Sequence, residues 1–161
     1  MNSQGAVSEL KLCVYTTLIG DYEELNEQPM AGQSKVPFVC LTDHPQLRSE
    51  TWIPRHVLPL FPMDPVRSQR DLKLRAVDHL PGFDLSLYVD NTVLLEAPPE
   101  EIIERYFPQS GLSLPKHSFR ESLLDEFLEV SRQGLEDASR LFEHLSHLAA
   151  SDPGVLEEPP F

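Results

Sequence analysis

Short apolar runs, each bounded by turn-forming residues, dominate the first two thirds of the chain. The runs at 11–18, 37–41 and 85–89 are rich in β-formers and too short for typical helices, so each predicts a largely buried strand. A run at 52–57 predicts another strand, and Pro54 confines it to a sheet edge because proline lacks the N–H that a central ladder needs. The pattern therefore indicates a sheet of short strands.

Polar residues directly follow three of these strands. They occupy 16–22, 42–44 and 90–92, and the apolar pattern resumes at 93–95 and again at 112–114, where we expect two more short strands. In open α/β sheets, ligands collect outside the carboxyl ends of strands, because helix amino ends and loop amides converge there. A ligand site is therefore expected at these polar segments.

A helix is expected between Asp64 and His79. Asp64 can accept from free backbone amides as the N-cap, Pro65 suits the first helical position, and the Pro-Gly pair at 81–82 ends the helix. Spacings of three and four residues place two apolar side chains and two cations along one edge of this helix: Val66, Arg70, Lys73 and Val77. The two cations are thereby placed to face a ligand.

Three further helices are expected after the polar segment at 90–92. The first spans 98–106 and has acidic residues in its first turn, where the helix dipole favours them. The second begins at a capping box from Ser118 to Glu121 and ends near Gly134, and the third spans 137–150. The apolar faces of the last two helices include Leu123, Leu124, Phe127 and Val130, and then Leu141, Phe142, Leu145 and Leu148.

Length and composition fit one loop-rich α/β domain over 1–161. A chain of 161 residues can bury one sizeable core, and 15 prolines against 7 glycines indicate many stiff connections. No internal repeat and no linker interrupts the chain. Cys13 and Cys40 lie in separate apolar runs without a CxxC spacing, so we expect two buried, reduced thiols.

The charge and the amino-terminal segment narrow the partners and the compartment. A formal net charge of -13 repels the phosphate backbone, so no nucleic-acid partner is expected, although a local cluster of cations can still bind a small phosphorylated ligand. The polar start lacks the pattern of a secretory signal, and no apolar run is long enough for a membrane span. A cytoplasmic protein is therefore expected.

The candidate chemistry is the binding of a diphosphate by a divalent metal ion and a basic side chain. Asp90 supplies a hard oxygen ligand for Mg²⁺ or Mn²⁺, and Arg70 or Lys73 supplies a cation for the phosphates. Plainer alternatives stay open, because Asp-Asn-Thr after a strand is also a common turn and helix cations are commonly solvated. His117 could orient a phosphate or serve as an ordinary loop histidine, and His144 with His147 fits an exposed helix face.

Five blocks of sequence, in a fixed order, resemble a glycosyltransferase-like family related to GT-A enzymes of family 8. The resemblance covers about 12–160, and the blocks are YTTLIGDYEELNEQP, VPFVCLTDHP, the helix from Arg67 to Lys73, SLYVDNTVLL and LPKHSFRESLLDEFLEV. It implies a GT-A, Rossmann-like fold with a mixed sheet flanked by helices. It also implies a hexosyltransferase-type enzyme that moves a sugar from a nucleotide-diphosphate donor to an unknown acceptor.

The resemblance also implies roles for particular residues. The tip of the first strand would hold the base and ribose, a basic residue on the helix before the metal motif would reach the donor, and Asp90 would bind Mn²⁺ or Mg²⁺. The implied nucleotide-sugar-binding set is Thr16, Thr17, Gly20, Tyr22, Asp43, Arg70, Lys73, Asn91 and His117.

Two departures from the family pattern favour a second interpretation. Thr92 stands where these enzymes usually carry a second aspartate, and the relatives extend beyond the end of this chain, which implies a missing acceptor-binding part. The alternative is a catalytically inactive domain of the same fold that binds nucleotides or proteins. Apolar surface left exposed by a shortened domain would allow a homo-oligomer.

Overall fold

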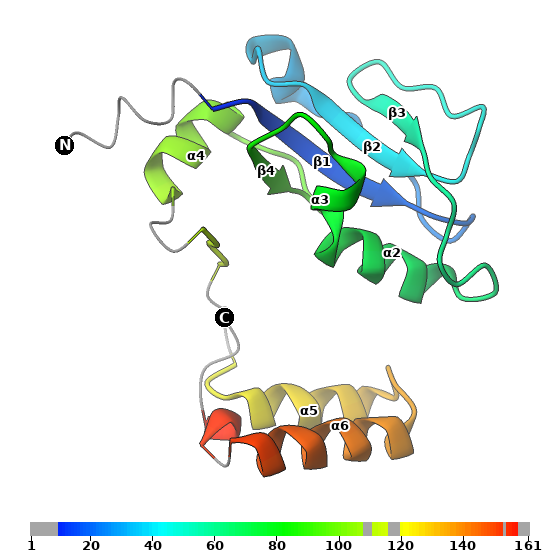
Figure 1. The fold of residues 1–161 in the computed structure, drawn as a ribbon, viewed down its shortest axis with the longest axis vertical. Helices are drawn as coiled ribbons and strands as arrows, with labels where there is room; N and C mark the ends of the chain where they lie inside the picture. Colours follow the sequence, from blue (N-terminus) through cyan, green and yellow to red (C-terminus); the bar gives the residue numbers. More distant parts are fainter. Residues whose placement is uncertain (1–9, 108–110, 116–119, 153, 158–161) are drawn as a thin grey trace. The chain divides into compact units, whose positions relative to one another are not determined.

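The computed structural model describes residues 10–107, 111–115, 120–152 and 154–157 (Figure 1). The chain forms two compact units, Met1–Phe107 and Pro108–Phe161, and each is described by itself. The organisation of the whole chain as one domain stays a prediction, as does the role of His117, which lies outside the described residues.

The first unit is built on a four-stranded sheet. Its strands are β1 (Leu12–Leu18), β2 (Phe38–Thr42), β3 (Ile53–His56) and β4 (Leu85–Tyr88), in the order β3-β2-β1-β4. All three pairings are parallel, which confirms the α/β class and is compatible with a Rossmann-like fold. β3 lies at the edge that Pro54 predicted.

The expected mixed sheet is wrong for the described residues, and so are the extra strands at 93–95 and 112–114, which lie outside every strand. The buried side chain of Gln28 explains the first of these two segments. Its Nε2 donates to the Val93 carbonyl at 2.7 Å, and its Oε1 accepts from the Leu95 N–H at 3.0 Å. One side-chain amide thus provides the hydrogen bonds that a neighbouring strand would have provided.

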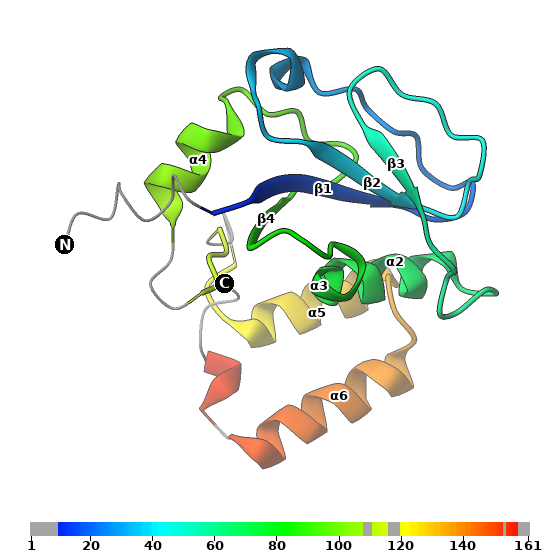
Figure 2. The same cartoon turned by 45° about the horizontal axis from the view of Figure 1, so that its top comes forward.

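Two helices follow β3 on one face of the sheet, as Figures 1 and 2 show: α2 (Pro65–Leu74) and α3 (Ala76–His79). The predicted start is confirmed, because the Asp64 side chain accepts from the Arg67 N–H at 2.9 Å. The predicted single helix is wrong in its middle, because Arg75 leaves helical geometry with φ −111° and ψ 28°. α4 (Pro99–Tyr106) then forms where a helix was expected.

The buried line of α2 differs from the expected one. Ser68 and Leu72 are buried, and Ala76 continues that line into α3. Val66 and Val77, which were expected to make apolar contacts, are instead 44% and 79% exposed. The buried positions recur every four residues and are out of phase with the predicted stripe, so a different side of the helix faces the sheet.

The core lies on both faces of the sheet. Alternation along β1 sends Cys13 and Tyr15 toward α2 and α3, and sends Val14 and Leu18 to the other face. Cys13 and Cys40 are free and fully buried, as predicted. Burial raises the pKa of the Cys13 thiol to about 11 and that of Cys40 to about 12, so both stay protonated at neutral pH.

The second unit contains two helices, α5 (Leu123–Gln133) and α6 (Ala138–Ser151), and a short 3-10 turn, η2 (Val155–Glu157). A capping box lies at Ser122 and Asp125, since these two residues exchange the side-chain to backbone bonds that define it; the predicted box begins at Ser118, which lies outside the described residues. α5 ends at Gly134 in a left-handed conformation, as expected.

The apolar faces of these two helices are only partly as predicted. Leu124 is 39% exposed and Phe142 is 67% exposed, whereas the other expected members are half-buried. Within this unit, therefore, the two helices cover only part of each other's apolar faces. In the described part of the chain, no helix is long and apolar enough to cross a membrane.

Candidate functional site

The strand order creates a natural ligand position in the first unit. The chain proceeds outward from β1 to β2 and β3, and then crosses back to place β4 on the other side of β1. Ligands of open α/β sheets bind outside the carboxyl ends of the strands at such a reversal. The residues just after β1 and β4 therefore define the candidate site, which brings together the predicted polar segments at 16–22 and 90–92.

Asp90 lies on the α2 side of this edge and already contacts one hydrogen-bond donor and one cation. The Tyr88 hydroxyl donates to Asp90 Oδ1 at 2.7 Å, and Lys73 Nζ lies 3.6 Å from the same oxygen. The Lys73 ammonium also sits over the Tyr88 ring, 4.3 Å from its centroid. The predicted lysine and the predicted carboxylate thus meet, and Tyr88 is a third member that the sequence patterns did not single out.

The two tyrosines beside this pair hold it in place. The Tyr15 hydroxyl donates to the Lys73 carbonyl at 2.8 Å, and the Tyr15 and Tyr88 rings lie 5.1 Å apart. Burial raises the pKa of Tyr88, and its hydrogen bond to Asp90 raises that pKa further. Both phenols therefore remain hydrogen-bond donors at neutral pH. The Thr17 hydroxyl is buried beside Tyr88 without meeting hydrogen-bond geometry with a described partner.

Asn91 turns to the opposite side of the edge and links β4 to β1. Its Oδ1 accepts from the Thr16 hydroxyl at 2.7 Å, and its Nδ2 donates to the Thr17 carbonyl at 3.0 Å. Asn91 is 4% exposed, and both threonines are fully buried. In this structure the three predicted residues join the strand ends to one another, and their role in ligand binding stays a prediction.

Glu23 connects the loop after β1 to both β4 and α2. Its Oε2 accepts from Asn91 Nδ2 at 2.7 Å and from Gln69 Nε2 at 2.9 Å. Gln69 Oε1 accepts in turn from the Tyr22 hydroxyl at 2.6 Å. Burial and the nearby Glu23 charge raise the pKa of Tyr22, whereas the charge of Arg70 lowers it. Tyr22 and Arg70 thus belong to the same neighbourhood, as predicted, through partners that the sequence did not indicate.

Gly20 and Asp43 meet where β1 and β2 end. The Gly20 N–H donates to Asp43 Oδ1 at 3.1 Å, and His44 Nε2 lies 2.8 Å from the Gly20 carbonyl. The ring of His44 also lies 3.8 Å from Asp21 and 3.5 Å from Asp43, measured between nitrogen and carboxylate oxygen. The predicted residues Gly20 and Asp43 are therefore in contact, and their hydrogen bond helps to fix the loop after β1.

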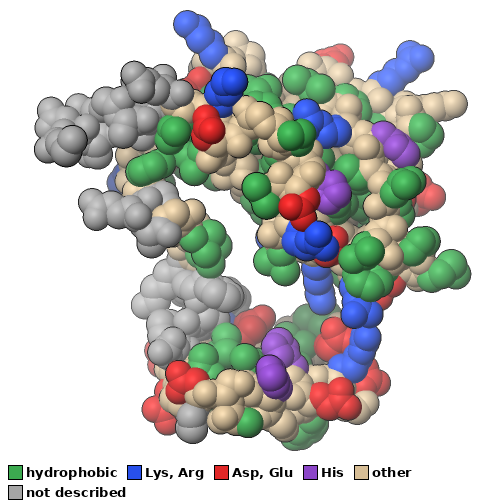
Figure 3. Space-filling view, viewed as in Figure 1, with side chains coloured by type: hydrophobic (Ala, Val, Ile, Leu, Met, Phe, Trp, Pro, Cys, Tyr) green, Lys and Arg blue, Asp and Glu red, His purple; other side chains and the backbone are tan. Residues whose placement is uncertain are grey.

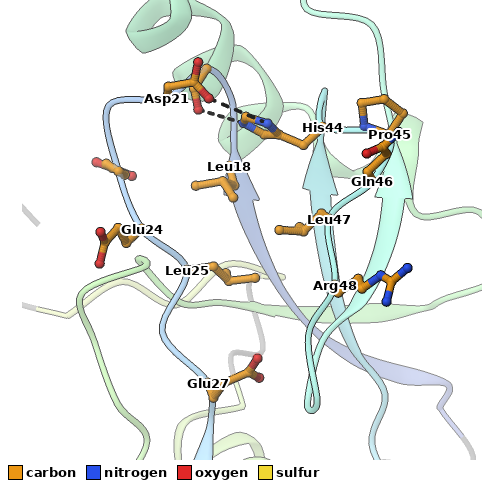
Figure 4. A pocket seen from close by; sticks show the side chains of 12 residues that line it. Leu18, Asp21, Glu24, Leu25, Glu27, His44, Pro45, Gln46, Leu47 and Arg48 are labelled. Atoms are coloured by element: carbon orange, nitrogen blue, oxygen red, sulfur yellow. Dashed lines mark hydrogen bonds and ion pairs between the residues drawn. The ribbon is translucent and has the colours of Figure 1, made fainter.

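A wide, open pocket of about 620 Å³ lies between this loop and the segment after β2 (Figure 4). Leu18, Leu25 and Leu47 point into it, and His44 and Asp21 close one end. Four carboxylates and one arginine are also in its lining: Asp21, Glu23, Glu24, Glu27 and Arg48. Glu23 lines this pocket and also binds Asn91, the neighbour of Asp90, so it connects the pocket with the Asp90 side.

The side chains available for a divalent cation are few. Asp90 offers one carboxylate that is 56% exposed, and the described residues contain no group of three His, Cys, Asp or Glu that could hold a metal ion. Magnesium is commonly held by one or two carboxylates together with substrate phosphates. Asp90 therefore suits a cation that arrives with a diphosphate and does not make a complete protein site for the cation.

The sequence patterns missed Glu23 and Gln69, and they placed Tyr88 beside the site without giving it a role. Glu23 lies in a stretch without periodicity, so no local signal marked it. Gln69 lies one helical turn before Lys73, and this spacing could have placed it on the same side of α2.

Comparison with known proteins gives no relative: no protein-family model, curated protein or solved structure matches this chain.

Proposed function

We propose that the first unit binds a nucleotide-diphosphate sugar at the edge between β1 and β4, in a GT-A type of fold, and transfers the sugar to an acceptor of undetermined identity. The observation that carries the proposal is the Asp90 carboxylate 3.6 Å from the Lys73 ammonium at the strand-order reversal. In the transfer, the bond between the sugar and the diphosphate breaks, a bond to the acceptor oxygen forms, and the acceptor proton leaves.

The Lys73–Asp90 pair is suited to exchange partners. Both side chains are about half exposed, and ion pairs of this kind contribute little to stability, so opening the pair costs little. A diphosphate with its divalent cation would bind the Asp90 carboxylate through the cation and the Lys73 ammonium through a phosphate oxygen. The cation would neutralise the charge that develops on the leaving diphosphate.

The pocket in Figure 4 supports a place for the nucleoside. Leu18, Leu25 and Leu47 offer an apolar floor for a flat base, and His44 offers a polar group at the rim. The carboxylates around the pocket repel phosphate, which favours the neutral end of the ligand there and the phosphates beside Lys73. The cation is needed all the more, because the lining of the pocket holds one arginine against four carboxylates.

A binding domain without transfer activity is the second candidate. Thr92 is exposed and stands where a second carboxylate would complete the metal motif, and Asp90 is already bonded to Tyr88. A neutral hydroxyl is a weaker ligand for a hard cation than a carboxylate is. Nucleotide binding without turnover is the outcome that this arrangement would give.

Calorimetric titration with UDP and Mn²⁺ tests the binding proposal. We expect saturable binding to the full chain, and binding weaker by about 10- to 100-fold for Asp90→Asn and for Lys73→Met, since each substitution removes one charge-assisted contact. Absence of heat at millimolar UDP, or binding by both variants as tight as that of the unchanged chain, would contradict the proposed site.

Asp78→Asn is the matched control for the titration. Asp78 is an aspartate of the same unit, its side chain is 51% exposed against 56% for Asp90, and it pairs with Arg75 at 2.8 Å. Its loss removes the same charge at another place, so binding should match that of the unchanged chain. Release of free sugar from UDP-sugar donors, measured above a blank, then separates an enzyme from a binding domain.

A further inference from the structure

Five exposed apolar side chains of the first unit belong to one continuous stretch of chain that ends with α2. They come from the loop between β3 and α2 and from α2 itself, and Met63 is 97%, Leu74 84% and Leu58 82% exposed. We call this set, with two flanking cations, the α2 patch: Leu58, Leu60, Met63, Val66 and Leu74 with Arg67 and Arg70. Figure 3 shows apolar and basic side chains side by side over this part of the molecule.

The helical part of the patch faces away from the sheet. Val66, Arg70 and Leu74 follow one another at intervals of four residues, so they lie along one line of α2. The buried line of the same helix passes through Ser68 and Leu72, two residues out of phase and therefore on the opposite side. α2 thus buries one apolar line against the sheet and presents a second one outward.

The apolar loop before α2 has a constrained backbone, and one of its aromatic rings contacts an arginine of α2. Three prolines fix the backbone around its exposed side chains, at positions 59, 62 and 65. The Arg67 guanidinium lies over the Phe61 ring, 4.2 Å from the centroid. An arginine is thereby held beside the apolar tip.

Charge in this part of the chain differs in sign from the rest. Residues 53–80 hold five of the 13 Lys and Arg residues and three of the 26 Asp and Glu residues, which is a net charge of +2. The remaining residues carry a net charge of −15. On the patch itself, Arg67 and Arg70 outnumber Asp64, whose carboxylate caps the start of α2, so this apolar surface is weakly basic on an acidic protein.

We propose that the α2 patch docks the first unit on an anionic lipid surface. An apolar tip that enters the boundary between headgroups and acyl chains, flanked by arginines that meet acidic headgroups, is the chemistry of a peripheral membrane contact. The patch shares Arg70 with the predicted nucleotide-sugar-binding set and otherwise consists of residues outside that set and outside the pocket lining, so the proposal holds whether or not the chain transfers sugar.

The large negative charge of the whole chain does not prevent this contact. At physiological ionic strength, charges are screened beyond about 8 Å, so the membrane responds mainly to the residues that approach it. The screening of distant acids lets the basic patch act alone. Because the arginines act on the membrane through electrostatic attraction, the affinity should fall as salt is added.

Flotation with vesicles tests the docking. The full chain should float with vesicles of 30% phosphatidylglycerol in phosphatidylcholine, and much less with phosphatidylcholine alone. Binding should weaken by about 30-fold in Arg67→Gln/Arg70→Gln, because each cation near an anionic membrane contributes roughly a factor of five. Leu58→Ser/Met63→Ser should also lose binding, whereas the control Val93→Ser/Leu94→Ser changes two exposed apolar residues outside the patch and should float normally.

A fluorescent label distinguishes lipid from protein as the occupant. Both native cysteines are buried, so an environment-sensitive dye will attach to the introduced thiol of Met63→Cys. Its emission should shift to the blue on addition of the anionic vesicles, and the dye on Leu94→Cys should not respond. Equal flotation of all variants, no flotation at all, or a blue shift that rises with protein concentration without vesicles overturns the proposal, the last in favour of a second copy.

Discussion

Among the residues of the candidate site, Asn91 contributes most to holding the site in place. Its side chain accepts from Thr16 and donates to the Thr17 carbonyl and to Glu23, and its own carbonyl accepts from Asn26 Nδ2 at 2.7 Å. Every hydrogen-bonding group of the buried amide is engaged. The direction in which the preceding residue, Asp90, points depends on this anchorage.

Asn91→Ala should lower the free energy of unfolding by about 2–3 kcal/mol, because it leaves the buried Thr16 hydroxyl and part of the Glu23 carboxylate without a partner. Guanidinium unfolding followed by Trp52 emission measures the change. Thr92→Ala, at the exposed neighbouring position, should stay within about 0.5 kcal/mol of the unchanged chain. Equal stability of the two variants would show that Asn91 does not anchor the edge.

The residue scale also separates what could be predicted from what could not. The meeting of Lys73 with Asp90 followed from a helix and a strand end whose positions the apolar pattern gave. The bridge through Glu23 and Gln69 did not follow, because it joins a loop without periodicity to a helix side chain 46 residues later in the chain. Such contacts depend on how a loop folds back, and no local pattern encodes this.

At the scale of elements, Gly20 fits the end of β1 against the start of α2. Its φ of +69° lies in the region that favours glycine, and a Cβ there would stand 3.0 Å from the Pro65 Cβ and Cγ atoms. The loop that carries Tyr22 and Glu23 therefore leaves β1 at a point with no room for a side chain.

Gly20→Ala should cost about 2–3 kcal/mol of stability, from the backbone conformation and from the contact with Pro65 together. Gly82→Ala is the matched control, since φ is +91° there and nothing lies within 4 Å of the added carbon, so only the backbone cost remains. Thermal unfolding of both variants isolates the contact. If both variants lose the same free energy of unfolding, the contact between residue 20 and Pro65 does not contribute to the loss.

Strands and helices were predicted best where apolar residues follow one another without interruption. The four strands and the start of α2 were found within a few residues, because burial on both faces and an N-cap leave clear local signals. The segment at 93–95 was wrongly predicted as a strand because its residues are apolar. In the structure, the buried Gln28 side-chain amide binds the backbone groups that would otherwise pair with a neighbouring strand. The break in the helix at Arg75 could not be predicted, because no proline or glycine marks it.

At the scale of the whole molecule, the fully enclosed side chains belong to the first unit. Among the described residues, every buried position lies at or before Ile103, and α5 and α6 contain none. Since cooperative stability comes mostly from buried apolar surface, the first unit should carry most of it.

A fragment of Met1–Phe107 should therefore fold by itself. Trp52 is the only tryptophan, is 3% exposed and packs edge-on against Phe38 at 5.4 Å, so its emission reports on this core. The fragment should keep the emission maximum of the full chain and unfold cooperatively in guanidinium. Emission like that of the denatured chain would show that the first unit needs the remaining residues.

The edge position of Pro54 affects how the sheet meets other chains. The Val57 N–H donates to the Thr42 carbonyl of β2, so alternation along the strand turns the Pro54 nitrogen away from β2 and toward solvent. A foreign strand that tried to extend the sheet there would find no donor at the centre of the edge. The proline ring in this short strand thus makes edge-to-edge pairing with another chain less favourable on that side.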